Sequence, residues 1–155
     1  MHRKRTRLYA ILVSLLLLLT VAFIFSRSMK SVAESSAESQ QAMELLQSFL
    51  EIFVGPGNVT NHLVRKLAHF CEFGLLGTEL GLLILLLGRQ SGCWLAFGAL
   101  PALLVALGDE TIQIFSDRGS QVKDVWLDFA GAVCGLLFVF LVRLCIRKGD
   151  ARGKG

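Results

Sequence analysis

Residues 8–25 read LYAILVSLLLLLTVAFIF, a run of 18 residues without a charged side chain. An apolar run of this length is typical of a membrane-spanning helix. A cleaved signal peptide is the alternative, because the basic residues 3–7 precede the run. The run is longer than the usual ~7–15 apolar residues of a signal peptide, and the small residues Ser31 to Ala33 lie well beyond its end. We therefore expect an uncleaved membrane anchor.

The composition of the whole chain also indicates a membrane protein. Of its 155 residues, 54% are hydrophobic and 18% are charged, whereas about 25% are charged in soluble domains. The mean hydropathy is +0.60. These values exclude a disordered chain, a collagen-like chain and a disulfide-rich secreted scaffold. Further apolar runs at about 67–87, 93–115 and 125–142 are continuous rather than alternating, which excludes a β-barrel. We predict an all-α integral membrane protein with four transmembrane helices.

The distribution of Lys and Arg predicts the orientation of these helices. Most of the 16 basic residues fall inside if the N-terminus is cytoplasmic, and four spans then place both termini in the cytoplasm. The net charge of +4 therefore serves to orient the chain in the cell membrane, and we expect no nucleic-acid partner. The predicted parts are residues 1–25 (basic N-terminus and first span), 26–64 (extracytoplasmic loop), 65–145 (core with three spans) and 146–155 (basic cytoplasmic tail).

The extracytoplasmic loop divides into two halves. Residues 31–41 are rich in Ser, Glu and Gln, and we expect them to be flexible or weakly helical. In residues 42–54 apolar side chains recur at helical spacing, which predicts a short amphipathic helix on the membrane interface or across the bundle mouth. Gly55, Pro56 and Gly57 end this pattern.

The four cysteines lie in or beside apolar segments and have no CxxC spacing. They are Cys71, Cys93, Cys134 and Cys145. Because cysteine buries readily as a small apolar side chain, we expect all four to pack in the helix bundle.

Polar side chains gather where the second span begins, the third ends and the fourth begins. With the predicted topology all of them lie near the outer surface, and ionisable groups at such positions are costly unless paired, solvated or useful. Helical spacing also places them in one stripe per helix. The predicted ligand-binding residues are Arg65, Lys66, His69, Glu72, Asp109, Glu110, Gln113, Arg118, Asp124 and Asp128. The same residues could equally form a structural network of salt bridges, and the spacing alone does not decide between the two.

Several chemistries fit these residue types. His69 and Glu110 are candidate acid/base groups, and Arg118 presents a fork suited to an anion. We predict no zinc site, because no HExxH sequence is present, and no cofactor. A hard divalent cation held by carboxylates is the weaker alternative. Glu79 extends a polar line from His69 toward the middle of the membrane, which is a candidate proton path.

Two motifs resemble those of the VanZ-like family. Residues 65–77, RKLAHFCEFGLLG, resemble its first motif. Residues 109–115, DETIQIF, followed by Arg118, Asp124 and Gly131, resemble its second motif. At position 128 the chain has Asp where the family pattern leads us to expect Asn. The resemblance implies a small membrane protein of the bacterial cell envelope, and the family's namesake is associated with low-level resistance to the glycopeptide teicoplanin.

Together these features predict an outer-facing site for an anionic, membrane-tethered group. A lipid headgroup, a lipid-linked cell-wall precursor and an amphiphilic antibiotic are the candidate ligands. The alternatives are an intramembrane hydrolase or transferase acting on a lipid phosphate or ester, and a small transporter that uses Glu79. The glycine pairs Gly77/Gly81 and Gly131/Gly135 predict close helix packing within the chain, with a homodimer as the alternative.

Overall fold

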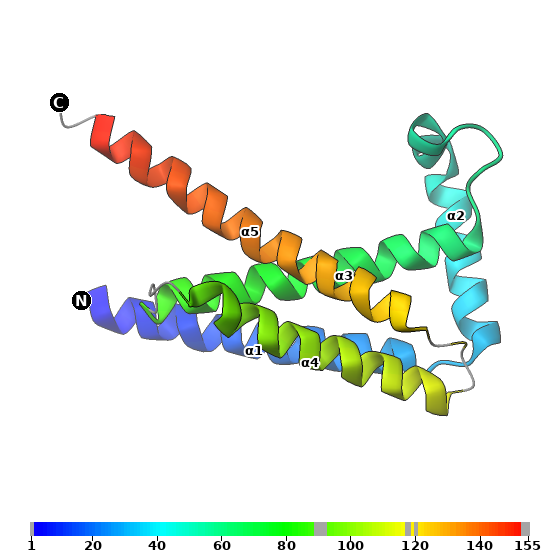
Figure 1. The fold of residues 1–155 in the computed structure, drawn as a ribbon, viewed down its shortest axis with the longest axis horizontal. Helices are drawn as coiled ribbons and strands as arrows, with labels where there is room; N and C mark the ends of the chain where they lie inside the picture. The colour runs from blue at the N-terminus through cyan, green and yellow to red at the C-terminus, as the bar shows by residue number, and fades with distance from the viewer. Residues whose placement is uncertain (1, 89–92, 117–118, 120, 153–155) are drawn as a thin grey trace.

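The protein consists of helices throughout the part of the chain that can be described. The computed structural model describes residues 2–88, 93–116, 119 and 121–152, which contain five helices and no strand (Figure 1). The helices are α1 (His2–Ser28), α2 (Val32–Val54), α3 (Asn61–Leu86), α4 (Trp94–Phe115) and α5 (Val122–Arg152). The predicted all-α class is confirmed.

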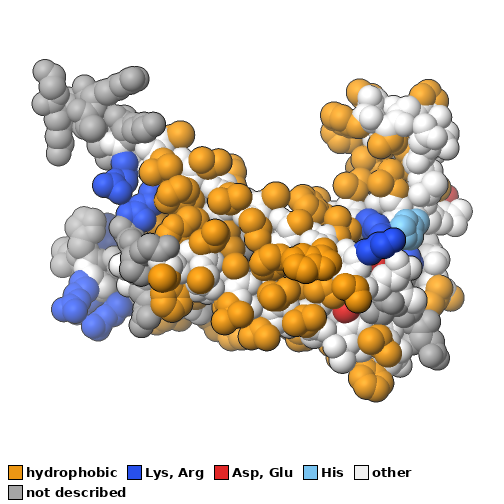
Figure 2. All heavy atoms as spheres, viewed as in Figure 1, with side chains coloured by type: hydrophobic (Ala, Val, Ile, Leu, Met, Phe, Trp, Pro, Cys, Tyr) orange, Lys and Arg blue, Asp and Glu red, His pale blue; other side chains and the backbone are white. Residues whose placement is uncertain are grey.

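Four of these helices are long and apolar enough to cross a membrane. They are Arg3–Ser28, Asn61–Leu86, Trp94–Phe115 and Val122–Arg147. Large apolar side chains cover their outer surfaces, such as Leu18 at 65%, Leu104 at 62% and Phe138 at 60% exposure. Figure 2 shows hydrophobic side chains spread over the body of the bundle. Such a surface is unfavourable in water and suits a hydrocarbon solvent, so the chain is a multi-pass membrane protein.

The start of α1 and the end of α5 lie at the same end of the bundle, and α2 runs across the opposite end (Figure 1). This arrangement follows from an even number of spans. The cytoplasmic placement of both termini stays a prediction from the distribution of Lys and Arg.

Three spans are longer than the apolar runs that predicted them: α1 extends beyond residues 8–25 at both ends, and α3 and α5 begin earlier or end later than expected. Helix α3 begins at Asn61 because Thr60 is its N-cap and accepts a hydrogen bond from the Leu63 N–H at 3.2 Å. Helix α5 continues past residue 142 to Arg152, so residues 146–152 of the predicted tail are helical. Both of these extensions contain charged residues, such as Arg65 and Lys66 in α3 and Arg143 and Arg147 in α5, and these interrupt the apolar run that hydropathy detects.

Helix α2 is longer than the segment 42–54 expected from its amphipathic pattern. It begins at Val32, so the stretch 31–41 is regular helix rather than flexible or weakly helical. The cause is a capping box in which Glu34 N–H donates to Ser31 Oγ at 3.3 Å and Ser31 N–H donates to Glu34 Oε2 at 2.9 Å. The helix ends at Val54, where Gly55 has a φ of 86° that favours glycine.

Helices α3 and α5 form the tightest contact in the bundle, and glycines permit it. A Cβ atom at Gly77 would lie 1.9 Å from the backbone oxygen of Ala132, and one at Gly135 would lie 2.0 Å from the backbone oxygen of Gly74. The glycine stripes therefore pack helices within the chain, as expected. Fully buried apolar side chains surround this contact, including Phe73, Leu76 and Leu136.

The expectation that the cysteines pack in the core is wrong. All four are free thiols with exposed side chains, namely Cys71, Cys93, Cys134 and Cys145. In a membrane protein the outer surface of a helix is also apolar, so an apolar surrounding in the sequence does not distinguish the core from the lipid-facing side.

Candidate functional site

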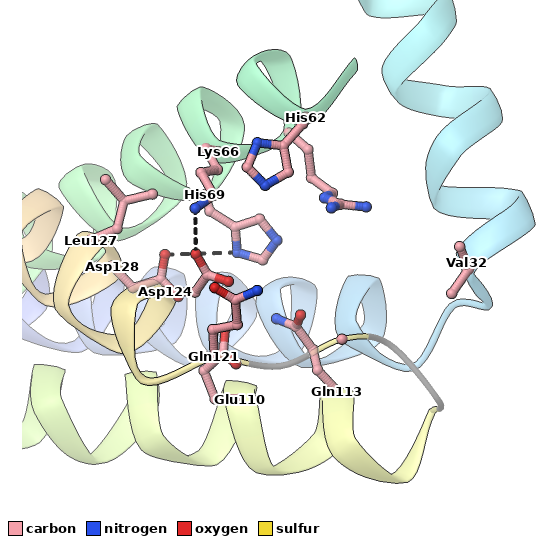
Figure 3. A pocket seen from close by; sticks show the side chains of 12 residues that line it. Val32, His62, Lys66, His69, Glu110, Gln113, Gln121, Asp124, Leu127 and Asp128 are labelled. Carbon is pink, nitrogen blue, oxygen red and sulfur yellow. Dashed lines mark ion pairs between the residues drawn. The ribbon is translucent and has the colours of Figure 1, made fainter. Parts of the chain in front are cut away.

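A cavity of about 250 Å³ lies at the end of the bundle that α2 crosses (Figure 3). Helix α3 contributes His62, Arg65, Lys66 and His69, helix α4 contributes Glu110 and Gln113, and helix α5 contributes Asp124, Leu127 and Asp128. Val32 of α2 and the residues Gly119 and Gln121 before α5 complete the lining. Three spans therefore present polar side chains to one common space.

Most of the residues expected at a ligand site line this cavity. They are Arg65, Lys66, His69, Glu110, Gln113, Asp124 and Asp128. Asp109 and Glu72 do not line it, although Asp109 contacts His69 directly. Arg118, to which the sequence assigned the contact with an anion, lies outside the described residues.

His69 lies between two carboxylates on two other helices. Its Nδ1 atom is 3.7 Å from Asp109 Oδ2 and 3.8 Å from Asp128 Oδ1. Asp109 is completely buried and Asp128 is 2% exposed, whereas the His69 side chain is 15% exposed. In Figure 3 the Asp128 carboxylate points toward the His69 ring. The residues carrying this arrangement come from α3, α4 and α5.

Two neighbouring side chains orient the Asp109 carboxylate. Gln113 Nε2 donates to Asp109 Oδ2 at 2.8 Å, as the i, i+4 spacing predicts. The hydroxyl of Ser28, at the end of α1, donates to Asp109 Oδ1. Sequence reasoning missed Ser28, although the end of the first span lies at the same predicted depth as the other polar groups, and this depth was the signal that could have found it.

The Asp128 carboxylate is only partly satisfied. Its Oδ2 atom is buried and has no hydrogen-bond partner within the described part of the chain. A buried ionised carboxylate is strongly unfavourable unless it is paired or coordinates a metal. This atom is therefore an unused acceptor at the wall of the cavity.

Basic side chains line the cavity along α3. Lys66 Nζ lies 2.8 Å from Asp124 Oδ1 and joins α3 to α5. Arg65 and His62 lie one and four positions earlier on α3 and also line the cavity. Within the described residues no ion pair involves Arg65. The site thus combines a basic rim, His62, Arg65 and Lys66, with what we call the acidic floor. The acidic floor consists of His69 and Asp128, which line the cavity, and Asp109, which does not line it but contacts His69.

Glu72 belongs to a separate ionic network. Arg27 of α1 pairs with Glu38 of α2 at 2.7 Å and lies 3.7 Å from Glu72. Lys30 also pairs with Glu38, and its hydrogen bond is the main cause that lowers the pKa of the Glu38 carboxyl. Glu72 contacts Arg27 of α1 and does not line the cavity, although it lies only three positions after His69 on α3. This network connects α1, α2 and α3 beside the cavity.

Glu79 is also separate from the cavity. Thr20 of α1 donates a hydrogen bond to Glu79 Oε1 at 2.9 Å, and Glu79 is 2% exposed. Glu79 does not line the cavity. Its contact with Thr20 joins α1 to α3 deeper in the bundle.

A family model described as VanZ/LLP1 matches residues 11–143. The chain belongs to the VanZ/LLP1 family. The match confirms the resemblance of residues 65–135 and extends it to most of α1 and all of α2. The matched region of this VanZ/LLP1 protein therefore includes Ser28, which contacts Asp109, and the ion-paired residues Arg27 and Glu38 beside the cavity. No curated protein and no solved structure matches the chain.

Proposed function

We propose that this VanZ/LLP1 protein binds an anionic, membrane-tethered group in the cavity at the α2 end of the bundle, on the outer side of the cell membrane. The observation that carries the proposal is the basic rim of His62, Arg65 and Lys66 on a cavity of about 250 Å³. Pockets for drug-sized ligands are usually about 300–1,000 Å³. The volume suits a headgroup whose acyl chains remain in the bilayer.

The rim offers donors of two kinds to an anion. Arg65 presents a planar fork that matches the oxygens of a phosphate or carboxylate. Lys66 offers a mobile ammonium group that pairs with Asp124 at 2.8 Å. A phosphate that enters the cavity competes with Asp124 for Lys66 and gains Arg65 as a second partner. Charge-assisted bonds of this kind are stronger than those between neutral groups.

The exposed apolar side chains of α2 support our proposal that the cavity lies at the membrane surface. Its second half exposes Leu45 at 86%, Ile52 at 76% and Phe53 at 72%, and it runs across the long helices (Figure 1). A helix with such an apolar face lies in the interface plane with this face buried among lipids. Val32 at the start of α2 lines the cavity, so lipid headgroups at this surface lie next to its opening.

A lipid-linked cell-wall precursor or an amphiphilic glycopeptide such as teicoplanin has the required chemistry, since each carries an anionic group attached to an acyl or prenyl chain. Binding either one gives a route to low-level teicoplanin resistance. The enzymatic alternative, in which His69 and Glu110 act on a lipid phosphate, uses the same cavity. In the enzymatic alternative the lipid is converted to a product, so a measurement of lipid-derived products distinguishes catalysis from binding alone.

The test measures lipid retention by the purified full chain. Native mass spectrometry after reconstitution with mixed phosphatidylglycerol and phosphatidylcholine is expected to show preferential retention of the anionic lipid. Arg65→Ala and Lys66→Ala should each reduce that preference, whereas Lys123→Ala, an exposed residue that does not line the cavity, should not. Arg118→Ala tests separately the role expected from the sequence.

Equal retention of both lipids by the wild type, or an unchanged preference in Arg65→Ala, would overturn the proposal. Teicoplanin susceptibility of a bacterial host is measured in parallel at matched membrane levels of each variant. Lipid preference without protection would separate binding from resistance, and release of a lipid-derived product would favour the enzyme.

A further inference from the structure

We propose that the acidic floor of the cavity is a divalent-cation site in which His69 Nδ1, Asp109 Oδ2 and Asp128 Oδ1 are the protein ligands. The inference goes beyond anion binding, because it concerns the floor rather than the basic rim and can be tested with the metal alone. The fitting cation is one that accepts both nitrogen and oxygen ligands, such as Zn²⁺ or Mn²⁺.

The distances between the three side chains fit one shared ion. All three ligand atoms lie within 4.8 Å of one another, and His69 Nδ1 lies 3.7 and 3.8 Å from the two carboxylate oxygens. With Zn²⁺ bonds of about 2.0–2.2 Å, two ligands of one ion can be at most about 4.4 Å apart. The same distances are too long for direct hydrogen bonds, which are usually ~2.7–3.2 Å. Both distances from His69 are therefore within the range that two ligands of one shared ion can have.

The buried carboxylates provide a second, independent observation. Only 2% of the surface of Asp128 is exposed. Its Oδ2 atom has no hydrogen-bond partner within the described residues. It lines the cavity and points toward His69 (Figure 3). Lys66, a nearby basic group, pairs with Asp124. Two ionised carboxylates this close repel each other, and a cation bound between them removes that repulsion.

The surroundings of Asp109 resemble the outer shell of a metal site. Ser28 donates to one oxygen of Asp109 and Gln113 donates to the other at 2.8 Å. Each oxygen keeps a second lone pair, so Asp109 Oδ2 can accept from Gln113 and still bind an ion. Such hydrogen bonds fix the orientation of a ligating carboxylate. Ser28 and Gln113 are positioning residues in this scheme.

The ligand set indicates the class of cation. Imidazole favours Zn²⁺ and related transition metals, whereas Mg²⁺ and Ca²⁺ prefer oxygen ligands alone. Three protein ligands leave at least one coordination position for water or an anion. Because His69 and Asp128 both line the cavity, that position faces the space beneath the basic rim. The set includes an imidazole nitrogen, whereas the alternative considered from the sequence is a hard cation held by carboxylates.

The test is a metal titration of the full chain in lipid nanodiscs after removal of metals with a chelator. Isothermal titration calorimetry with Zn²⁺, and separately with Mn²⁺, is expected to show one site per chain. Mg²⁺ and Ca²⁺ should compete weakly. Loss of a residue that hydrogen-bonds to a metal ligand lowers the metal affinity by about 10–100-fold. The Zn²⁺ affinity of Gln113→Ala should therefore be reduced by this factor. The affinities of His69→Gln and Asp128→Asn, which lack a ligand itself, should be reduced further.

Glu44→Gln is the matched control, because it removes one carboxylate at an exposed position of α2 that does not line the cavity. It should bind Zn²⁺ close to the wild-type affinity. The absence of stoichiometric Zn²⁺ and Mn²⁺ binding by folded wild type overturns the proposal, and this result does not depend on whether any variant folds. Binding that survives both His69→Gln and Asp128→Asn overturns it as well. The nanodiscs contain phosphatidylcholine alone, which carries no net charge, so neither result bears on the preference for an anionic lipid.

Discussion

Ser28, the last residue of α1, donates a hydrogen bond from its hydroxyl to Asp109 of α4, and both side chains are completely buried. The bond joins the first span to the acidic floor, although the two residues are 81 positions apart in the chain. It shows that α1 is part of the site region rather than only a membrane anchor. Asp109 in turn contacts His69, so the end of α1 helps to position the floor.

Ser28→Ala should destabilise the protein, because it leaves a buried carboxylate oxygen without its donor. The expected loss in unfolding free energy is about 1–3 kcal/mol. Thermal unfolding of the purified protein in detergent measures it. Ser26→Ala is the control, since Ser26 is exposed and bonds only to the Phe23 carbonyl among the partners seen. Equal melting temperatures of the two variants would contradict the structural role of Ser28.

Gly77→Ala should disrupt the contact between α3 and α5. The added methyl would lie 1.9 Å from the backbone oxygen of Ala132, so the helices must separate. Overpacking of this kind usually costs about 1–3 kcal/mol, and backbone cannot move aside as a side chain can. Gly74→Ala is the comparison, because its methyl meets Gly131 at an ordinary 3.7 Å. The free energy of unfolding, measured in mixed micelles, should be close to the wild-type value for Gly74→Ala and clearly lower for Gly77→Ala.

Thr20→Val should destabilise the contact between α1 and α3, because it removes the donor to the buried Glu79 carboxyl. Interhelical hydrogen bonds in membranes contribute about 1–2 kcal/mol. The double variant Thr20→Val/Glu79→Leu should recover much of the loss, since replacing both partners by apolar groups removes the unsatisfied atom. Thermal unfolding of the two variants tests this. A double variant less stable than Thr20→Val would show that the Glu79 side chain makes a further stabilising contact besides the one with Thr20.

Acid should loosen the docking of α2 on α1. The pKa of Glu38 is held below its ordinary 4.5, first by the hydrogen bond from Lys30 and further by the charge of Arg27. A carboxyl whose folded pKa is lowered contributes stability above its ordinary pKa and loses it as the pH falls through the lower folded value. The protection of amides in the first half of α2, expressed relative to the intrinsic exchange rate at each pH, should therefore decrease below pH 4.5. The effect should be small, because the side chains are partly exposed.

Glu38→Gln should abolish this pH-dependent change in hydrogen exchange, which we call the acid step, because it removes the carboxyl group that titrates. Glu44→Gln, on an exposed position of the same helix, should leave it in place. An acid step that persists unchanged in Glu38→Gln would assign the pH dependence to another group.

The sequence by itself determined the membrane class, the four spans and the depth of the polar residues. Length and hydropathy suffice for a span, since only a helix of about 20 apolar residues satisfies its backbone within the bilayer. Depth follows from the position of a residue along its span. This is why Arg65, His69, Gln113 and Asp128 could be assigned to one end of the bundle before any contact was known.

Only the tertiary structure decided which of these side chains face one another. Helical spacing made Glu72 a neighbour of His69, but Glu72 faces Arg27 while His69 faces Asp109 and Asp128. The rotation and crossing of α3 and α5 depend on the backbone contact at their glycines, which a single-helix pattern does not encode. The contact between Ser28 and Asp109 is likewise visible only in the tertiary structure. The pattern within one helix does not show which other helix lies beside it.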